Sequence, residues 1–161
     1  MLNLTNQQII TAFYTAFQKK DYQTMQNCYA DEALFSDPVF QNLNAIQVRN
    51  MWEMLCKSGK DLKLEYSNIS TNDNHGEADW IATYTFSKTG RKVVNKIHAS
   101  FEFDNGKILK HHDSFNFYLW ARQAMGLSGF LLGWSTIFQN KVQKNALKSL
   151  NNFSEKNNKI P

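Results

Sequence analysis

The stretch 92–117, KVVNKIHASFEFDNGKILKHHDSFNF, decides the fold of this chain. Apolar and polar residues alternate on both sides of Asp-Asn-Gly at 104–106, and such alternation is typical of β-strands with one buried face. Asn and Gly tolerate the positive φ that a tight hairpin turn requires. The stretch therefore predicts two antiparallel strands joined by a hairpin, with the second strand continuing through residue 120.

The same alternation continues upstream of this hairpin, in segments 62–70 and 77–87. Earlier segments instead show helical spacing. Thr5 and Gln8 fit a capping box that begins a helix over 6–19, and a third helix is expected over 45–57, with Gly59 just past its end. Helices first and strands afterwards indicate an α+β domain with at least four antiparallel strands.

Two shorter pieces lie between these helices. Asp21 is expected to cap a short helix that reaches about Tyr29, and ALFSDPVF at 33–40 is expected to be extended. Pro38 contributes to that expectation, because the residue before a proline is disfavoured in helical conformation. The extended piece therefore carries Asp37 out of any helix.

The C-terminal part of the chain differs in pattern. Segment 120–153 predicts a helical extension in two pieces, broken near Gly126 and Gly129. Its second piece carries five apolar residues in helical register, namely Ile137, Phe138, Val142, Ala146 and Leu150. Covering the open end of the sheet, forming a dimer and packing on the body all remain open as roles. Residues 154–161 are expected to be a disordered tail after one domain over 1–150.

Charge is concentrated in the same C-terminal part. The chain has a net charge of +4, and residues 136–161 contain five lysines and one glutamate, so the rest is neutral. A basic helix can contact nucleic acid or anionic lipid, but a solvated face is the commoner explanation. No apolar run reaches the ~20 residues of a membrane span, and the N-terminus lacks a signal-peptide pattern. We expect a cytoplasmic protein without nucleic-acid or membrane partners.

The last strand of the hairpin should divide its side chains between two faces. The face with the aromatic residues should look inward and carry Leu109, His111, Asp113, Phe115 and Phe117. The other should be polar and carry Ile108, Lys110, His112, Ser114 and Asn116. An inward carboxylate is costly unless it is hydrogen-bonded. His111 and Asp113 are therefore candidate functional residues, and His112 is expected to face solvent.

Neighbouring strands should add to the same inner face. The preceding strand contributes Ile97, Ala99, Phe101 and Phe103, with Asn95 as a polar exception, and the strand before it contributes Trp80, Ala82, Tyr84 and Phe86. His98 falls on the opposite face. An apolar pocket with a few convergent polar groups is typical of a small-molecule site.

Two segments of the chain resemble a known family. YADEALFSDPVF at 29–40 and the long stretch from Trp80 to Gly126 are similar to the SnoaL-like, ketosteroid-isomerase-like proteins of the nuclear transport factor 2-like superfamily. The resemblance covers most of 5–150. It implies a cystatin-like α+β roll, in which a strongly curved antiparallel sheet forms a cone around N-terminal helices. It also implies a homodimer formed through the outer sheet face.

What the resemblance implies for function depends on single positions. Family members include isomerases, dehydratases, epoxide hydrolases and aldol cyclases, usually without cofactor, and also non-catalytic binding modules. In ketosteroid isomerase an Asp base works with a Tyr and a protonated Asp that stabilise an oxyanion. Asp37 matches the base, but Phe13, next to Tyr14, and Ala99 stand at the two donor positions. Steroid isomerisation by that mechanism is not expected.

We expect a cofactor-independent enzyme that transfers protons on a small apolar ligand, with Asp37, His111 and Asp113 as catalytic residues. The expected substrate-binding residues are Tyr14, Trp52, Trp80, Tyr84, Asn95, Phe101 and Phe115. The alternative is a non-catalytic ligand-binding or dimerisation module, in which His111 and Asp113 form a structural pair and Asp37 only starts a turn. A metal site would need a third ligand before His111 in the chain, and none is expected.

Overall fold

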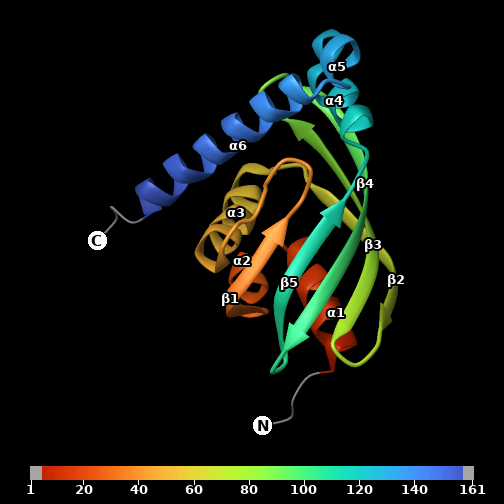
Figure 1. Cartoon of the computed structure of the whole chain (residues 1–161), viewed down its shortest axis with the longest axis vertical. Helices are drawn as coiled ribbons and strands as arrows, with labels where there is room; N and C mark the ends of the chain where they lie inside the picture. Colours follow the sequence, from red (N-terminus) through yellow and green to blue (C-terminus); the bar gives the residue numbers. More distant parts are fainter. Residues whose placement is uncertain (1–4, 158–161) are drawn as a thin grey trace.

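The structure is a computed structural model, and it describes residues 5–157. Those residues form six helices and five strands (Figure 1). In chain order the elements are α1 (Asn6–Gln18), α2 (Tyr22–Asn27), β1 (Tyr29–Ser36), α3 (Ala45–Ser58), β2 (Lys63–Thr71), β3 (His75–Phe86), β4 (Arg91–Asp104), β5 (Lys107–Ser114), α4 (Phe117–Met125), α5 (Leu127–Leu132) and α6 (Thr136–Asn157).

The five strands form one sheet in the order β1-β5-β4-β3-β2. Strands β2 to β5 are the predicted antiparallel meander, and the turn between β4 and β5 has positive φ at Asn105 and Gly106. Strand β1 was expected only as a short extended piece. It pairs in parallel with β5, so that Phe35 lies opposite His111. This pairing brings a segment from before α3 to the strand with the candidate functional residues.

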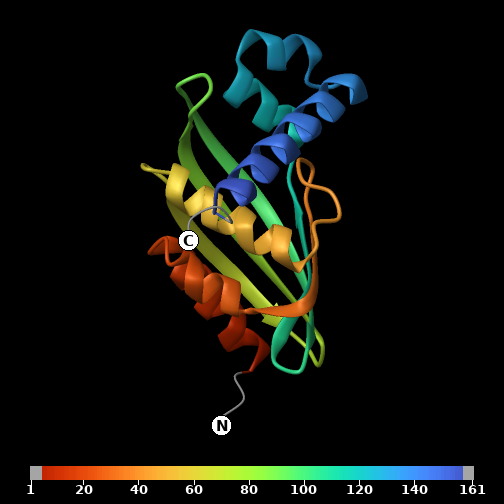
Figure 2. The same ribbon diagram turned by 90° about the vertical axis from the view of Figure 1, so that its left-hand side faces the viewer.

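The helices α1, α2 and α3 lie on one side of the curved sheet (Figure 2). Helix α1 begins at the predicted capping box, in which Thr5 and Gln8 satisfy each other's backbone N–H groups. It buries Ile9, Ile10, Phe13, Tyr14 and Phe17 against the concave face of the sheet. The predicted fold class, an α+β cone around N-terminal helices, is confirmed.

The face assignment in the second hairpin strand is correct from Lys110 onward but not before it. Ile108 is fully buried and Leu109 is half-buried, the reverse of what alternation predicted. The register shifts between Glu102 and Phe103, because these pair with Lys110 and Ile108 and leave Leu109 as an extra residue. Such a β-bulge inserts one residue and changes which face the neighbouring side chains occupy.

The strand is also shorter than predicted. Strand β5 ends at Ser114, and α4 begins at Phe117, where alternation had suggested strand as far as residue 120. The side chain of Asn116 accepts a hydrogen bond from Leu119 N at 3.0 Å and so caps α4. An N-cap of this kind favours a helix locally, whatever the apolar pattern of the residues that follow.

The C-terminal extension contains three helices instead of two pieces. Gly126, with φ 59°, separates α4 from α5, and residues 133–135 separate α5 from α6. Helix α6 runs to Asn157, into the segment expected to be a disordered tail, and 158–161 lie outside the described residues. It packs on the body, burying Val142 and Leu150. No helix within 5–157 combines the length and apolar character needed to cross a bilayer.

Candidate functional site

A chain of five hydrogen-bonded side chains runs through the centre of the molecule. Trp52 Nε1 donates to the Tyr29 hydroxyl at 2.8 Å, and that hydroxyl lies 2.7 Å from His111 Nδ1. His111 Nε2 lies 3.0 Å from Asp113 Oδ1, which also accepts from Trp80 Nε1 at 3.3 Å. All five side chains are buried. The buried carboxylate therefore has the partners that its burial requires.

The positions of the protons in this series of hydrogen bonds follow from counting donors. Burial raises the pKa of Tyr29 well above its usual value, so the phenol keeps its proton. The indole of Trp52 donates to the phenol oxygen, which leaves that proton for His111 Nδ1. Nδ1 is then an acceptor, and Nε2 carries the hydrogen that His111 donates to Asp113. The arrangement selects a neutral imidazole in one tautomer.

The imidazole of His111 is enclosed by aromatic rings. Phe101 lies 4.3 Å from it between ring centroids, Phe13 and Phe35 meet it edge-on, and Tyr29 and Trp52 stack on it. The ring does not line the cavity described below. His111 therefore reaches a bound ligand only through Asp113, although the sequence suggested it as a proton-transferring residue.

A cavity of about 300 Å³ opens next to Asp113. Its walls come from the sheet, from α3 and from the C-terminal helices, which places α6 over one end of the cone (Figure 1). Seven of the ten predicted site residues line it, namely Asp37, Trp52, Trp80, Tyr84, Asn95, Asp113 and Phe115. The apolar walls and few polar groups are typical of small-molecule sites.

Asp37 is held in a turn at the wall of this cavity. Its Oδ1 accepts hydrogen bonds from the backbone N–H groups of Val39 and Phe40, both at 2.6 Å. Desolvation by the surrounding walls raises the pKa of Asp37 to about 7; the two N–H bonds oppose the shift, and the charge of Asp113 adds to it. A carboxyl that titrates near neutral pH can both take and return a proton.

Two further polar groups of the cavity are free to bind a ligand. Trp120 Nε1 donates to the Tyr84 hydroxyl at 2.9 Å, and burial raises the pKa of Tyr84, so the phenol proton remains available. Asn95 is only 9% exposed and lines the cavity, and no hydrogen bond among residues 5–157 involves its carboxamide. An amide at a cavity wall can instead hydrogen-bond a ligand or water.

The remaining predicted site residues lie outside the cavity. Phe101 packs against His111, and Tyr14 stacks on Tyr66, with ring centroids 5.4 Å apart. The Tyr14 hydroxyl is the buried side-chain atom that lacks a hydrogen-bond partner in the described part of the chain. Tyr14 and Phe101 therefore support the walls from behind.

Sequence reasoning missed Tyr29 and Trp120 as partners of the site. Alternation alone gave no sign that β1 would add to the sheet beside β5, which is what brings Tyr29 to His111. Trp120 lies where the expected strand meets the expected helical extension, but its hydrogen bond to Tyr84 depends on α4 beginning at Phe117, which was not predicted.

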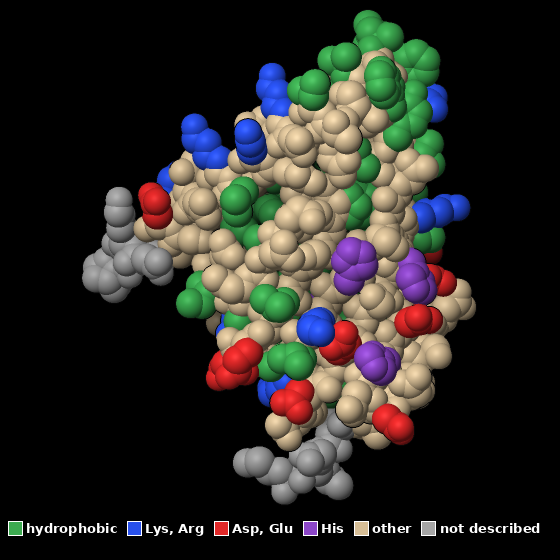
Figure 3. Space-filling model, in the orientation of Figure 1, with side chains coloured by type: hydrophobic (Ala, Val, Ile, Leu, Met, Phe, Trp, Pro, Cys, Tyr) green, Lys and Arg blue, Asp and Glu red, His purple; other side chains and the backbone are tan. Residues whose placement is uncertain are grey.

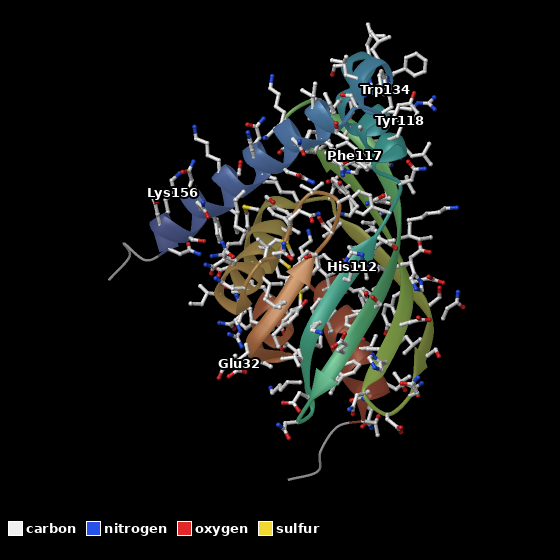
Figure 4. All side chains as sticks on the ribbon, viewed as in Figure 1. Glu32, His112, Phe117, Tyr118, Trp134 and Lys156 are labelled. Atoms are coloured by element: carbon white, nitrogen blue, oxygen red, sulfur yellow. The ribbon has the colours of Figure 1, made fainter. Side chains whose placement is uncertain are left out.

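The outer face of the sheet carries two other histidines. His112 is exposed on β5 (Figure 4), and His98 Nδ1 lies 2.8 Å from Asp79 Oδ1 on the same outer side. Both positions agree with the alternation of the sequence. Within 5–157 no three His, Cys, Asp or Glu side chains are gathered as the ligands of one metal ion.

Comparison with known proteins agrees with this geometry. A family model described as a SnoaL-like domain matches residues 10–111, well over half of the chain. No curated protein sequence matches the chain. Among solved structures, an LEH-like epoxide hydrolase of M. tuberculosis shares 16% identity, over 76% of this chain and 92% of that one, with a TM-score of 0.58.

Two further solved structures have TM-scores of 0.63. A proposed polyketide cyclase from Pseudomonas putida KT2440 is 15% identical, over 75% of this chain and 98% of that one. A protein with a ketosteroid isomerase-like fold from Catenulispora acidiphila, in complex with trimethylamine, is 10% identical, over 75% and 95%. At these identities the likeness concerns the fold alone, and it agrees with the fold expected from the sequence.

Proposed function

The chain belongs to the SnoaL-like domain family, and from that premise we propose that it is a cofactor-independent enzyme that moves a proton on a small apolar carbonyl compound. The observation that carries the proposal is the carboxyl of Asp37, which lines the cavity with a pKa raised to about 7. A general base works best when its pKa lies near the working pH.

The proposed step begins with the deprotonated carboxylate of Asp37. It removes a proton from the carbon next to the substrate carbonyl. The electron pair of that C–H bond forms a double bond to the carbonyl carbon, and the π pair of the carbonyl moves onto its oxygen. The hydroxyl of Tyr84 and the amide N–H₂ of Asn95 donate hydrogen bonds to the resulting enolate oxygen. Asp37, now protonated, returns the proton to another carbon or to a leaving hydroxide, which gives isomerisation or dehydration.

Asp113 is the second carboxyl of the cavity. Its Oδ1 accepts from His111 and Trp80, whereas no hydrogen bond from the described residues reaches its Oδ2. We infer that Oδ2 contacts the substrate and that His111 is a positioning residue, which fixes the orientation of Asp113 without touching the ligand. The apolar walls formed by Trp80 and Phe115 would exclude water from the reacting carbon.

The test uses hydrogen exchange, because it requires no knowledge of the final product. Small apolar ketones and β-ketoesters are incubated with the protein in D₂O, and uptake of deuterium next to the carbonyl is followed by mass spectrometry. We expect exchange faster than the buffer rate, reduced ~100-fold or more in Asp37→Asn. Asp79→Asn, on the outer face, is the matched control and should exchange like wild type.

The non-catalytic alternative predicts a different result. In a ligand-binding or dimerisation module of the same fold, a bound ketone would raise the melting temperature of the protein, but the ketone would take up no deuterium. Equal exchange rates in wild type and Asp37→Asn would reject Asp37 as the base. If the protein binds ketones but exchanges deuterium in none of the compounds tested, it is a ligand-binding protein and not an enzyme of this kind.

A further inference from the structure

The end of the molecule formed by α5 and the start of α6 carries large apolar side chains in contact with solvent. We call this surface the apolar tip, and it consists of Leu127, Phe130, Leu131, Leu132, Trp134 and Ile137. Trp134 is 74% exposed and Ile137 is 81% exposed. Figure 3 shows hydrophobic side chains gathered over α5, and Figure 4 places Trp134 at that end. A contiguous apolar patch of this kind marks an interaction surface.

The packing of α5 explains why its apolar residues face outward. Gly129 is buried against α4 so closely that a Cβ there would lie 1.9 Å from Ala121 O, and a Cβ at Gly133 would lie 3.0 Å from Ala121 Cβ. The side of α5 that faces the rest of the molecule is therefore formed by glycine, which has no side chain. The leucines and Phe130 are left on the outer side, where the core cannot cover them.

A row of lysines continues from the apolar tip along α6. Ile137, Lys141, Lys144 and Lys148 follow one another at steps of four, three and four residues, which places them on one face of the helix. All four are exposed, whereas Val142 and Leu150 on the other side of α6 are buried. Figure 3 shows the Lys side chains along α6 in the same view as the apolar tip.

Acidic side chains are absent from this part of the chain. The sequence contains no Asp or Glu between Asp113 and Glu155, and that stretch holds Arg122 and the three lysines of the row. Arg122 lies over the Phe130 ring, 5.3 Å from its centroid, at the edge of the apolar tip. An apolar end bordered by uncompensated positive charge is complementary to a lipid bilayer with an anionic surface.

We propose that the apolar tip and the lysine row dock this protein peripherally onto an anionic membrane surface. The apolar tip inserts at the level of the headgroups, with Trp134 in the interfacial region that indoles prefer. The lysines then lie against the charged headgroups. The basic C-terminal helix, which the sequence suggested was a solvated face, becomes one half of the contact. The proposal does not depend on the catalytic role of Asp37.

Other occupants fit this surface less well. A second copy meeting the same surface would bring two rows of lysines together without an acidic partner, which is repulsive. Nucleic acid would match the lysines but leave the exposed leucines and Trp134 without an apolar contact. A bilayer satisfies both halves at once.

The test measures binding to vesicles of phosphatidylcholine, with and without roughly one third phosphatidylserine, at about 0.1 M salt. Trp134 is a built-in reporter, because the other three tryptophans, Trp52, Trp80 and Trp120, are buried. We expect co-sedimentation with the anionic vesicles, a blue shift of the fluorescence, and weaker binding as salt is raised.

Two sets of variants test the two halves. Lys141→Gln/Lys144→Gln/Lys148→Gln should weaken partitioning on the order of 100-fold, since each lysine near the surface contributes about fivefold. Leu127→Ser/Leu131→Ser should abolish the blue shift. The matched control Lys60→Gln/Lys63→Gln/Lys96→Gln removes the same charge from exposed lysines elsewhere and should bind nearly as wild type. Asp37→Asn should also bind as wild type.

Four results would overturn the proposal. Wild type could fail to bind anionic vesicles, or could bind neutral ones equally well. The control variant could lose as much binding as the lysine-row variant, which would indicate a nonspecific charge effect. Finally, the protein could form a dimer in solution that Leu127→Ser/Leu131→Ser dissociates, which would assign the apolar tip to self-association.

Discussion

Nε2 of His111 lies 3.0 Å from Oδ1 of Asp113, and the two residues share the inner face of β5. The pair lies in the middle of a longer hydrogen-bonded chain, because Tyr29 occupies the other nitrogen of the imidazole. A neutral histidine that donates to a carboxylate fixes the position of that carboxylate without cancelling its charge. The orientation of Asp113 in the cavity therefore depends on Tyr29, which itself does not line the cavity.

The first prediction concerns Tyr29→Phe. The substitution keeps the ring and removes the hydroxyl, so Trp52 Nε1 loses its acceptor and His111 Nδ1 loses its donor. Buried groups left without partners cost about 1–3 kcal/mol, and we expect a loss of that size in the free energy of unfolding. Nitrogen NMR should show one tautomer, protonated at Nε2, in wild type and exchange between forms in the variant.

A matched control separates this effect from simple loss of a phenol. Tyr66→Phe removes a hydroxyl that lies 3.0 Å from Thr15 Oγ1 in a half-buried contact. This hydroxyl takes no part in the hydrogen bonds around His111. The substitution should cost less stability and leave the His111 spectrum unchanged. A wild-type spectrum with the proton on Nδ1 would contradict the donor count given above.

The second prediction concerns the pH dependence of stability through Asp37. Its pKa is about 7 in the folded protein and about 4 in an unfolded chain. The folded state therefore holds a proton that the unfolded state has released between these values. The contribution of Asp37 to stability is greatest below pH ~4 and is lost as pH rises to ~7, by roughly 4 kcal/mol at most.

Asp37→Asn tests this directly. The amide can still accept the N–H groups of Val39 and Phe40, but it does not titrate. Denaturant unfolding between pH 4 and 8 should show a smaller decline in the variant, which becomes the more stable protein above neutrality. The exposed Asp73→Asn should follow the wild-type curve. Parallel curves for wild type and Asp37→Asn would exclude the raised pKa.

The alternation of apolar and polar residues predicted that His111, Asp113 and Asn95 lie on the inner face, and the structure places them there. This part could be predicted because alternation depends only on neighbouring residues along one strand. The contact between Tyr29 and His111 joins residues 82 positions apart and requires β1 to pair in parallel with β5. No local pattern encodes that pairing, since an isolated extended segment can join either edge of a sheet.

The other differences from the prediction also have identifiable causes. One extra residue at Leu109 exchanges the faces of Ile108 and Leu109, because the period of a strand is two and a bulge shifts it by one. The titration of Asp37 depends on how deeply the cavity walls desolvate it, which is a property of the packed structure. The aspartate next to Pro38 was visible in the sequence, but its environment was not.

The third prediction concerns Asn95→Leu. The amide has no hydrogen-bond partner in the described residues, so replacing it by a side chain of similar volume should leave the melting temperature unchanged or raise it. A ligand that hydrogen-bonds this amide should lose affinity by about 10- to 100-fold. Thermal denaturation and titration calorimetry with any ketone that binds wild type would check both effects. The cavity-lining Ile97→Leu is a control that leaves the polar group in place. A fall in stability for Asn95→Leu would show that the amide has a structural partner.

The last prediction concerns Gly129→Ala, which tests the packing that turns the apolar side of α5 outward. A methyl group at this position would lie 1.9 Å from Ala121 O, which belongs to the backbone and cannot rotate away. Overpacking of this kind costs about 1–3 kcal/mol, and because α5 contacts mainly α4, the loss should be local. We expect amide hydrogen exchange to accelerate over 127–132 while β4 and β5 stay protected. Ser128→Ala, at an exposed neighbouring position, is the control and should change exchange little. Equal protection of α5 in Gly129→Ala and wild type would mean that α5 does not approach α4 through glycine, and the outward orientation of Phe130 and Leu131 would lose its explanation.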